Sequence, residues 1–584
     1  MRFLIAIVVL FLFMANPAFA QKDEARNSLH MINDALETGS ISEDEAMDLK
    51  IKILRGEALP ETFRSVIPIK CAFGISAEVQ GYLKTRPEKR IRLEKQEMQA
   101  VYDYNFTNKN GQMKTFRINY DVTGPDAVPP ENLNANSLPD WIEETAFALA
   151  HSYRLEVDTM GYREPLSFSS FGYYEVFIFD INDTYGYTET VTQISTSPDT
   201  YTSAIYLEND YVEGFATHGY DALRVTIGHE FFHAIQFSYI WRSGDTWYYE
   251  LSSTWMEDVT YDYVNDYYAY LPGYFNSPNI SLDATDGYSS AHWNHMIEKK
   301  YGRGVIKKSW EFMPTQNAIT SIDDAIKDNS SSNLSKNFSE FAVWNYYTAG
   351  RADSLTYFPE AVNYPKIKLL ANRLILDTLI QRSVPTLAAN YYSFYVLDTT
   401  HCEISFNAAQ SNNYFDVYTI EYNKASGKNF FINHSSSSLI AINNLLPGDT
   451  LLCLVVNKVI DKNLSNNYNY NLSLSIKQNA ITPDPLTNFH FYPSPFVLRS
   501  GSDKMNFKFV LGKTSKIEFK VYTISGKLLR KINYGEFGEG PYDGNSGLYW
   551  DGRDADGHLV PSGVYIYQFT GGGFKKTGKI AVVR

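Results

Sequence analysis

The stretch His229-Glu230-Phe231-Phe232-His233 contains two histidines four residues apart with a glutamate between them. On an α-helix, side chains four residues apart project from one face, so both imidazoles can bind the same Zn²⁺ ion. Glu230 is turned about 100° from His229 around the helix. It would lie beside the open position of the metal, where a carboxylate can take a proton from water. The stretch therefore predicts His229 and His233 as zinc ligands and Glu230 as the general base.

The surrounding residues support a helix from Asp221 to Tyr239. Asp221 is a favourable N-cap residue, and an apolar stripe lies on the side opposite the histidines. The residues of this stripe are Leu223, Ile227, Phe231 and Ile235. Upstream, Ser203 to Leu207 has the composition of a strand. In many zinc peptidases such a strand edges the cleft and pairs with the substrate backbone.

A third ligand is expected on the next helix, Trp247 to Tyr261. A metzincin would need Gly and His at positions 236 and 239, but these are Gln236 and Tyr239, which excludes that class. Instead, the run from Trp247 to Glu257 resembles the W-x-x-E-G-x-A-x-W-x-E helix of aminopeptidase-N-like gluzincins, with Leu and Ser in place of the Gly and Ala. The resemblance implies Glu250 as the third zinc ligand. Glu257 is the alternative ligand, or the acceptor of a hydrogen bond from a ligating histidine.

Other roles stay open at this stage. A gluzincin needs a donor for the tetrahedral oxyanion, and Tyr288, His292 and His295 are candidates. The GAMEN-type motif of the aminopeptidases is absent, so their exopeptidase activity is not implied. Cys71 is either a zymogen-style thiolate on the zinc or a buried inert thiol, and the sequence favours the second interpretation. A disulfide between Cys402 and Cys453 is plausible in an exported protein.

Residues 1–20 predict a signal peptide. Arg2 supplies the positive charge, Phe3 to Met14 is apolar, and Ala18-Phe19-Ala20 is a cleavage site. The apolar run is too short to span a bilayer. We therefore expect an exported protein that begins at Gln21, has no transmembrane segment and is secreted or bound at the cell surface. The net charge of −14 argues against nucleic acid as the main partner.

A chain of 584 residues is too long for one hydrophobic core, so we expect several domains. The fold class predicted is multidomain, an α+β zincin-like catalytic domain followed by two all-β sandwich modules. The expected parts are residues 21–65 (two short helices, a pro-segment or a brace), 66–380 (catalytic domain), 385–478 (sandwich) and 487–584 (C-terminal sandwich). Within the catalytic domain, further helices are expected over Trp141–Thr159, Ser289–Tyr301 and Gly304–Phe312, and strands over Phe116–Val122 and Tyr174–Asp180.

Residues 30–350 as a whole resemble a group of secreted bacterial metallopeptidases. The resemblance rests on the run from His229 to Gln236, on the following W-x-x-E helix and on the sequence around Tyr120 to Tyr162. It implies hydrolysis of protein or peptide substrates.

A loop before Trp141 has the spacing of an EF-hand. Oxygen-bearing side chains occupy positions 1, 3, 5, 9 and 12, and a backbone carbonyl occupies position 7. These residues are Asn132, Asn134, Asn136, Asp140 and Glu143, with Leu138 at position 7. Two carboxylates give only weak Ca²⁺ binding. The alternative is an Asn-rich turn before a capped helix.

The last 95 residues or so carry four blocks in a fixed order: Phe491–Phe496, Val521–Lys527, Trp550–Gly557 and Pro561–Tyr567. They closely resemble the immunoglobulin-like domain of flagellar hook-capping proteins and the sorting domains of type IX secretion. The resemblance implies the secretion machinery as a partner, and a purely adhesive or structural sandwich is the alternative. We expect Trp550–Gly557 to form a hairpin turn and not a calcium site.

The sequence thus favours a secreted zinc-dependent peptidase, most simply an endopeptidase. The competing hypothesis is a non-catalytic surface-binding protein with a peptidase-like domain. The complete set of His229, Glu230, His233 and Glu250 favours the enzyme, because a decayed site usually loses a ligand or the base first.

Overall fold

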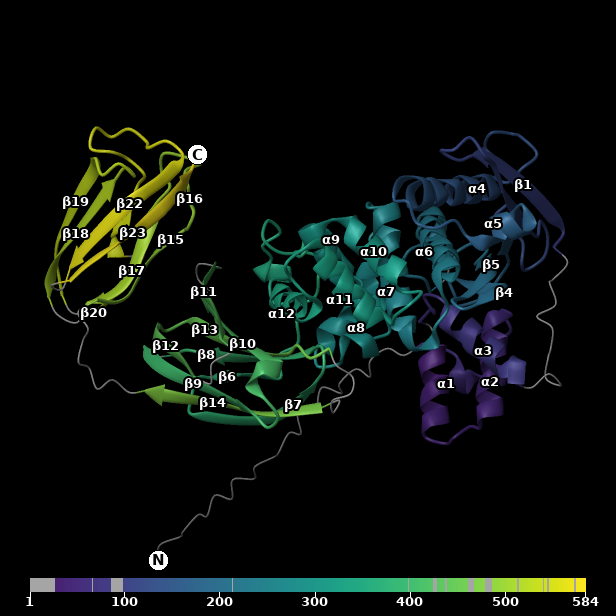
Figure 1. The fold of residues 1–584 in the computed structure, drawn as a ribbon, viewed down its shortest axis with the longest axis horizontal. Coiled ribbons are helices and arrows are strands. Elements are labelled where there is room, and N and C mark those ends of the chain that lie inside the picture. Colours follow the sequence, from purple (N-terminus) through teal and green to yellow (C-terminus); the bar gives the residue numbers. More distant parts are fainter. Residues whose placement is uncertain are drawn as a thin grey trace, which may run out of the picture. The chain divides into compact units, whose positions relative to one another are not determined.

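The computed structural model divides the chain into two compact units, each described here by itself (Figure 1). The first ends at Lys368, apart from short later segments, and the second holds most of the chain from Leu369 to Arg584. The structure describes residues 27–584 except 66, 86–97, 213, 398, 424–427, 436–438, 461–466, 478–485, 512–513, 539, 544–545 and 572–573. The predicted signal peptide and the expected start at Gln21 lie outside the described residues.

A five-stranded mixed sheet forms the scaffold of the first unit. In spatial order its strands are β1 (Ala100–Thr107), β2 (Met113–Tyr120), β3 (Tyr174–Ile178), β5 (Asp199–Leu207) and β4 (Gly186–Thr196). β2, β3 and β5 are parallel, and β1 and β4 are antiparallel to their neighbours. The predicted strand Ser203–Leu207 belongs to β5, which lies between β3 and β4. The expectation that it edges the cleft is therefore wrong, because β4 has the edge position.

The predicted helices around the His-Glu motif are present. They are α6 (Gly219–Tyr239), α7 (Thr246–Thr260), α9 (His292–Tyr301) and α10 (Arg303–Phe312). α6 packs against β5, β4, α4 and α7, so it is buried on nearly every side. His218 and not Asp221 is its N-cap residue; Asp221 lies in the first turn and pairs with Arg224 at 2.9 Å. The predicted helix Trp141–Thr159 is α4 (Asp140–Ser152), followed by a π-helical segment from Tyr153 to Thr159.

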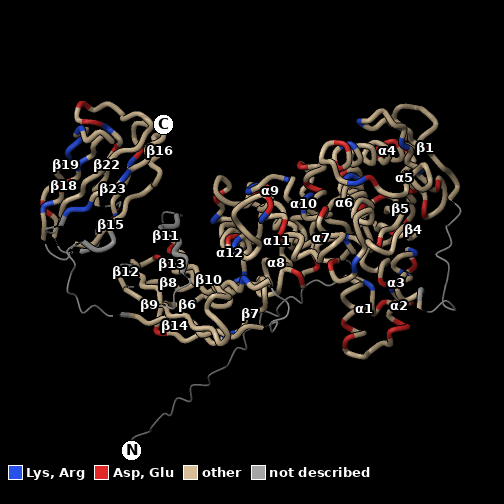
Figure 2. Tube along the Cα trace, in the orientation of Figure 1, with Lys and Arg blue, Asp and Glu red and all other residues tan. Residues whose placement is uncertain are grey.

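Three helices precede the sheet: α1 (Ser28–Glu37), α2 (Glu43–Leu54) and α3 (Phe73–Thr85). α2 begins with a capping box, since Ser42 accepts from the Glu45 N–H and the Glu45 carboxylate accepts from the Ser42 N–H. Acidic residues fill the first turn of α2, where the helix dipole favours them, and they are visible as red segments in Figure 2.

In the second unit, nine strands form two sheets. One has the order β11-β10-β13-β8-β6 and the other β12-β9-β14-β7. Their bounds are β6 Ala371–Leu374, β7 Thr378–Pro385, β8 Ala388–Tyr395, β9 Thr400–Ala408, β10 Phe415–Asn423, β11 Lys428–Ser435, β12 Leu439–Leu445, β13 Asp449–Asn457 and β14 Asn467–Lys477. Cys402 lies in β9 and Cys453 in β13. Both are buried and free, so the disulfide considered from the sequence is not formed.

The C-terminal part is again built from two sheets, β15-β17-β20 with β21 beside β17, and β16-β23-β22-β18-β19. The bounds are β15 Leu486–Tyr492, β16 Phe496–Val497, β17 Met505–Leu511, β18 Ser515–Tyr522, β19 Leu528–Phe537, β20 Gly540–Tyr542, β21 Tyr549–Trp550, β22 Gly563–Gly571 and β23 Phe574–Val583. A single aromatic-rich core between Phe489 and Val582 joins them. The expected hairpin turn is present, since the Asp554 N–H donates to the His558 carbonyl oxygen at 2.9 Å.

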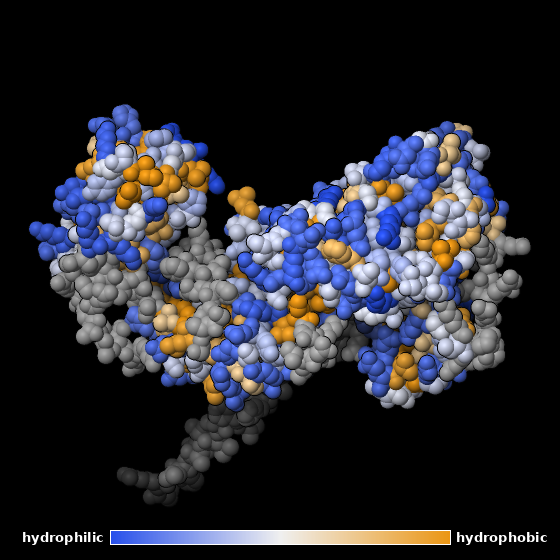
Figure 3. Space-filling view, in the orientation of Figure 1, coloured by the Kyte–Doolittle hydropathy of each residue, from blue (hydrophilic) through white to orange (hydrophobic). Residues whose placement is uncertain are grey.

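Hydrophilic residues cover much of the face shown in Figure 3, with separate hydrophobic patches between them. Scattered apolar residues of this kind are normal on a protein surface. Within the described residues, the helices are too short or too polar to cross a membrane.

Candidate metal centre

Three donor atoms from α6 and α7 converge in the interior of the first unit. Nε2 of His229 lies 3.1 Å from Nε2 of His233, and Oε2 of Glu250 lies 3.2 and 3.3 Å from these two nitrogens. Ligands about 2.0–2.1 Å from a tetrahedral zinc are separated by about 3.3 Å. The spacing of the three atoms therefore fits a zinc ion. Cys71 Sγ belongs to the same cluster, with all four donor atoms within 4.8 Å of one another.

The hydrogen-bond partners of the two Nδ1 atoms determine which nitrogen of each imidazole carries the hydrogen and which carries the lone pair. Nδ1 of His233 lies 2.7 Å from Oε1 of Gln236, and the Gln236 amide nitrogen donates to the Tyr249 carbonyl (3.0 Å) and to Ser253 Oγ (3.2 Å). With its amide nitrogen so engaged, Gln236 presents its oxygen to the ring. His233 Nδ1 then carries the hydrogen, and its Nε2 lone pair points inward.

His229 is held in the same way by Glu257, whose Oε1 lies 2.7 Å from Nδ1. Two inward lone pairs 3.1 Å apart repel each other unless a cation or a proton lies between them. Hydrogen-bonded imidazoles of this kind are characteristic of metal ligands. Glu257 thus accepts the hydrogen bond from His229, which is the second of the two roles that the sequence left open for it. Glu250 faces both rings.

The pKa values of the cluster reflect its need for positive charge. Burial alone would lower the pKa of His229, but hydrogen bonds to Glu250 and Glu257 outweigh it and raise the pKa to about 9. Burial alone would raise the pKa of Glu250, but His233 and His229 outweigh it and lower the pKa to about 2. The carboxylates of Glu250 and Glu257 therefore favour a positive charge at this place.

Glu230 is completely buried and lies against the edge strand β4. Thr188 Oγ1 is 2.8 Å from Oε2 of Glu230, whereas Oε1 is buried without a hydrogen-bond partner among the described residues. Burial raises the pKa of Glu230. β4 approaches α6 closely at Gly186, where an added Cβ would come within 2.9 Å of Thr226 Cγ2. One carboxylate oxygen is therefore oriented by Thr188, and the Cys71 thiol also interacts with this carboxylate.

Of the three oxyanion candidates, Tyr288 lies at the cluster. Its ring centroid is 6.1 Å from that of His229, and its hydroxyl donates to the Cys71 carbonyl oxygen at 3.2 Å. His292 is packed among aromatic rings, 4.8 Å from Phe341 between centroids, and burial lowers its pKa to about 3. His295 faces Asp258 at 3.8 Å.

Several contributors were not identified from the sequence. Lys70 forms ion pairs with Asp266 and with Glu257 (3.0 Å), and the Phe73 ring stacks on His233 with centroids 4.0 Å apart. Both lie far before the motif, so no local pattern indicates the contact. The role of Gln236 could have been predicted from the sequence, because a polar residue three positions after His233 lies on the same face of a buried helix.

The EF-hand-like loop forms a hydrogen-bonded turn. Asn134 and Asn136 donate amide hydrogens to the two carboxylate oxygens of Glu143 at 2.6 and 2.8 Å, and the Leu133 N–H donates to Asp140 at 2.9 Å. Pro139, and not an Asp or Asn, is the N-cap residue of α4. These contacts are those of an Asn-rich turn, and the calcium site stays a prediction.

Comparisons with known proteins cover only parts of the chain. No protein-family model matches it, and no curated protein matches it. A surface component of the type IX secretion system of Porphyromonas gingivalis, PorZ, is 22% identical over 17% of this chain and 12% of its own, with a TM-score of 0.12. FlgD from P. aeruginosa is 20% identical over 17% of this chain and 74% of its own (TM-score 0.12). The pre-peptidase C-terminal domain of a Bacillus anthracis collagenase is 20% identical over 19% of this chain and 100% of its own (TM-score 0.15).

Proposed function

We propose that the protein is an exported zinc-dependent peptidase with a zincin-like catalytic domain. The observation that carries the proposal is the pair of buried imidazoles on α6, each held at Nδ1 by an acceptor, with Nε2 directed at the other ring and at Glu250. This donor set of two imidazoles and a carboxylate is that of catalytic zinc sites. His229, His233 and Glu250 would hold the ion.

A bound zinc ion supplies Lewis-acid activation of water and of the scissile carbonyl. Glu230 then acts as the general base and later delivers the proton to the leaving amine. Thr188 orients one of its oxygens, and the buried position raises its pKa toward the range in which a carboxylate can both accept and return a proton.

Two further elements belong to the proposed reaction. The Tyr288 hydroxyl is already aimed at a backbone carbonyl beside the cluster, the position from which it can stabilise the oxyanion of a tetrahedral intermediate. The edge strand β4 is the side of the sheet to which an extended peptide could add, once its Gly186 carbonyl is released from the Ala72 N–H. Its residue Thr188 contacts the base, so a peptide along β4 would pass the catalytic centre.

The same proposal includes export by the N-terminal signal and sorting by the C-terminal module through the type IX secretion machinery. The sequence blocks of that module support sorting. Its aromatic-rich core lies between Phe489 and Val582, so the module has a hydrophobic core of its own.

Metal content tests the function first. The purified protein should carry about one zinc per chain, the stoichiometry of a single catalytic site, and His233→Ala should lose it. Glu230→Gln should keep the zinc and lower hydrolysis of an unfolded generic protein by about 10²–10⁴-fold, because water loses its base.

The exposed substitution Glu536→Gln, on β19, serves as the carboxylate control and should change neither quantity. A folded wild-type protein free of zinc after growth with zinc would overturn the metallopeptidase. Normal hydrolysis by Glu230→Gln would remove Glu230 from the role of base.

A further inference from the structure

The segment Ile69–Phe73, at the start of α3, lies beside residues 183–186, which lead into the edge strand β4. The Ile69 N–H donates to the Asp183 carbonyl (2.6 Å), the Tyr185 N–H to the Ile69 carbonyl (3.0 Å), and the Ala72 N–H to the Gly186 carbonyl (3.0 Å). This is a single parallel β-bridge between Ile69 and Thr184, followed by one hydrogen bond to the first residue of β4. An extended peptide ligand pairs with a sheet edge through backbone hydrogen bonds of the same kind. The backbone groups that a substrate would need at this place are thus already used by the protein's own chain.

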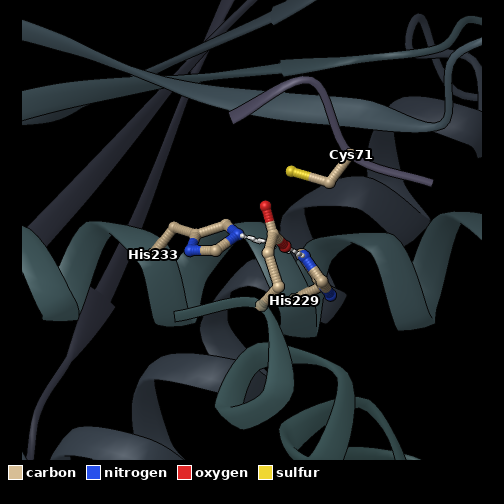
Figure 4. Close-up of side chains that lie close together, drawn as sticks. Cys71, His229 and His233 are labelled. Carbon is tan, nitrogen blue, oxygen red and sulfur yellow. Dashed lines mark hydrogen bonds and ion pairs between the residues drawn. The ribbon is translucent and has the colours of Figure 1, made fainter. Parts of the chain in front are cut away.

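The side chains of this segment point into the proposed catalytic centre. Figure 4 shows the sulfur of Cys71 close to His229 and His233, and the donor atoms of these residues lie within 4.8 Å of one another. On one side of it, Lys70 pairs with Glu257 and Asp266. On the other, Phe73 stacks on His233. All three side chains of this segment are buried, with at most 3% of their surface exposed.

The backbone of Cys71 also takes the place of a substrate. Its carbonyl oxygen accepts the hydrogen bond from Tyr288, the residue proposed to stabilise the oxyanion. Phe73 fills a pocket lined by His233 and by the rings of Phe237, Trp241 and Tyr249, with centroids 5.3, 5.2 and 5.6 Å away. One segment therefore engages the metal donors, the oxyanion donor and an aromatic pocket together.

We propose that Ile69–Phe73 is a built-in inhibitor of the metal site and that Cys71 Sγ is the fourth zinc ligand of the latent protein. The inference rests on the proposed metallopeptidase function and adds its regulation. It also places the inhibitory segment after residues 21–65, for which the sequence leaves open a pro-segment or a brace.

The sulfur would bind the zinc as a thiolate, because a coordinating thiol is deprotonated. Withdrawal of the segment would leave one coordination position of the ion to water, and the released thiolate would take up one proton from the solvent.

Release requires the whole segment to withdraw and not only the sulfur. The ammonium of Lys70 lies between two carboxylates, and the Phe73 ring lies on the face of a ligand. Removing Cys71 alone should therefore weaken the inhibition, while the flanking contacts still hold part of the segment in place. The aromatic pocket that Phe73 leaves would then accept an aromatic side chain of a substrate.

Cobalt substitution tests the ligand independently of activity. Full-length protein exchanged with Co²⁺ should show a near-ultraviolet thiolate-to-cobalt charge-transfer band, and Cys71→Ser should lose this band while it keeps about one metal per chain. Cys402→Ser, a buried free cysteine in the second unit, is the matched control and should keep the band.

Hydrolysis of a generic unfolded protein tests the inhibition. Cys71→Ser should raise the initial rate of the full-length protein on the order of tenfold, equivalent to about 1.4 kcal/mol of lost inhibition. Adding Glu230→Gln to Cys71→Ser should abolish the gain. Metal-bound wild-type protein without a thiolate band, or with a rate equal to that of Cys71→Ser, would overturn the inhibitor and leave the peptidase standing. A chain that binds no metal at all would overturn the peptidase itself. If Cys71→Ser does not fold, the spectrum of the wild-type cobalt protein alone decides whether sulfur is a ligand.

Discussion

At the scale of single residues, the centre depends as much on the groups behind the ligands as on the ligands. Gln236 and Glu257 accept from the outer nitrogens of His233 and His229 and so turn both Nε2 atoms inward. Lys70 in turn pairs with the second oxygen of Glu257. The orientation of each imidazole is therefore fixed by buried polar side chains behind it: Gln236 behind His233, and Glu257 with Lys70 behind His229.

Replacement of Gln236 tests this dependence. Gln236→Leu keeps approximate volume but leaves His233 Nδ1 without its acceptor, so zinc affinity should fall by about 10–100-fold. Competition with a chromogenic chelator measures the dissociation constant. Gln193→Leu, on the exposed part of β4, is the control and should leave the affinity unchanged. Unchanged affinity in Gln236→Leu would mean that His233 keeps its orientation without this hydrogen bond.

At the scale of elements, helices were easier to predict than the partners of strands. α6 and α7 combine a helical apolar period with a motif that itself requires a helix, so both were predicted within a residue or two. The edge position of β4 could not be found in this way. Which strand lies at an edge depends on the pairing order of β3, β5 and β4, and that order is set by long-range contacts.

The same limit applies to the site. The motif supplied His229, Glu230 and His233, and a family pattern supplied Glu250. The backbone pairing of Ile69–Ala72 with residues 183–186 had no local signal, because it joins residues more than a hundred positions apart in the chain. Asp221 has the right chemistry for an N-cap, yet the helix begins two residues earlier, where His218 has the extended backbone that the cap position requires.

Gly287 gives a prediction at this scale, since it directly precedes Tyr288 and packs against α7 beside Glu250. Its φ is +87°, and an added Cβ would lie 2.5 Å from the Trp247 carbonyl oxygen and 2.6 Å from Glu250 Cβ. Gly287→Ala should therefore destabilise the fold by about 1–3 kcal/mol and weaken zinc binding through Glu250. Thermal unfolding and zinc titration measure the two effects. Gly244→Ala, with open space around the new methyl group, should be nearly neutral; equal behaviour of both variants would contradict the argument.

At the scale of the whole molecule, the proposed catalytic residues and the C-terminal module belong to different compact units. The buried core of the module consists of residues between Phe489 and Val582, contributed by both of its sheets. A core of this kind needs no side chain from elsewhere to exclude water. Catalysis and delivery should therefore be separable in this protein.

Deletion of residues 487–584 tests that separation. The truncated protein should keep its zinc and its hydrolytic rate, because His229, His233 and Glu250 all lie in the first unit. Export across the inner membrane should also persist, since it depends on the N-terminal signal. Delivery to the surface or the medium should fail if the module is a sorting signal, and the truncated protein should accumulate in the periplasm. Fractionation of the native host with full-length and truncated protein measures the distribution. Equal amounts of both outside the cell would favour an adhesive or structural sandwich. Loss of zinc from the truncated protein would show that the metal centre depends on the module, which would contradict the separation.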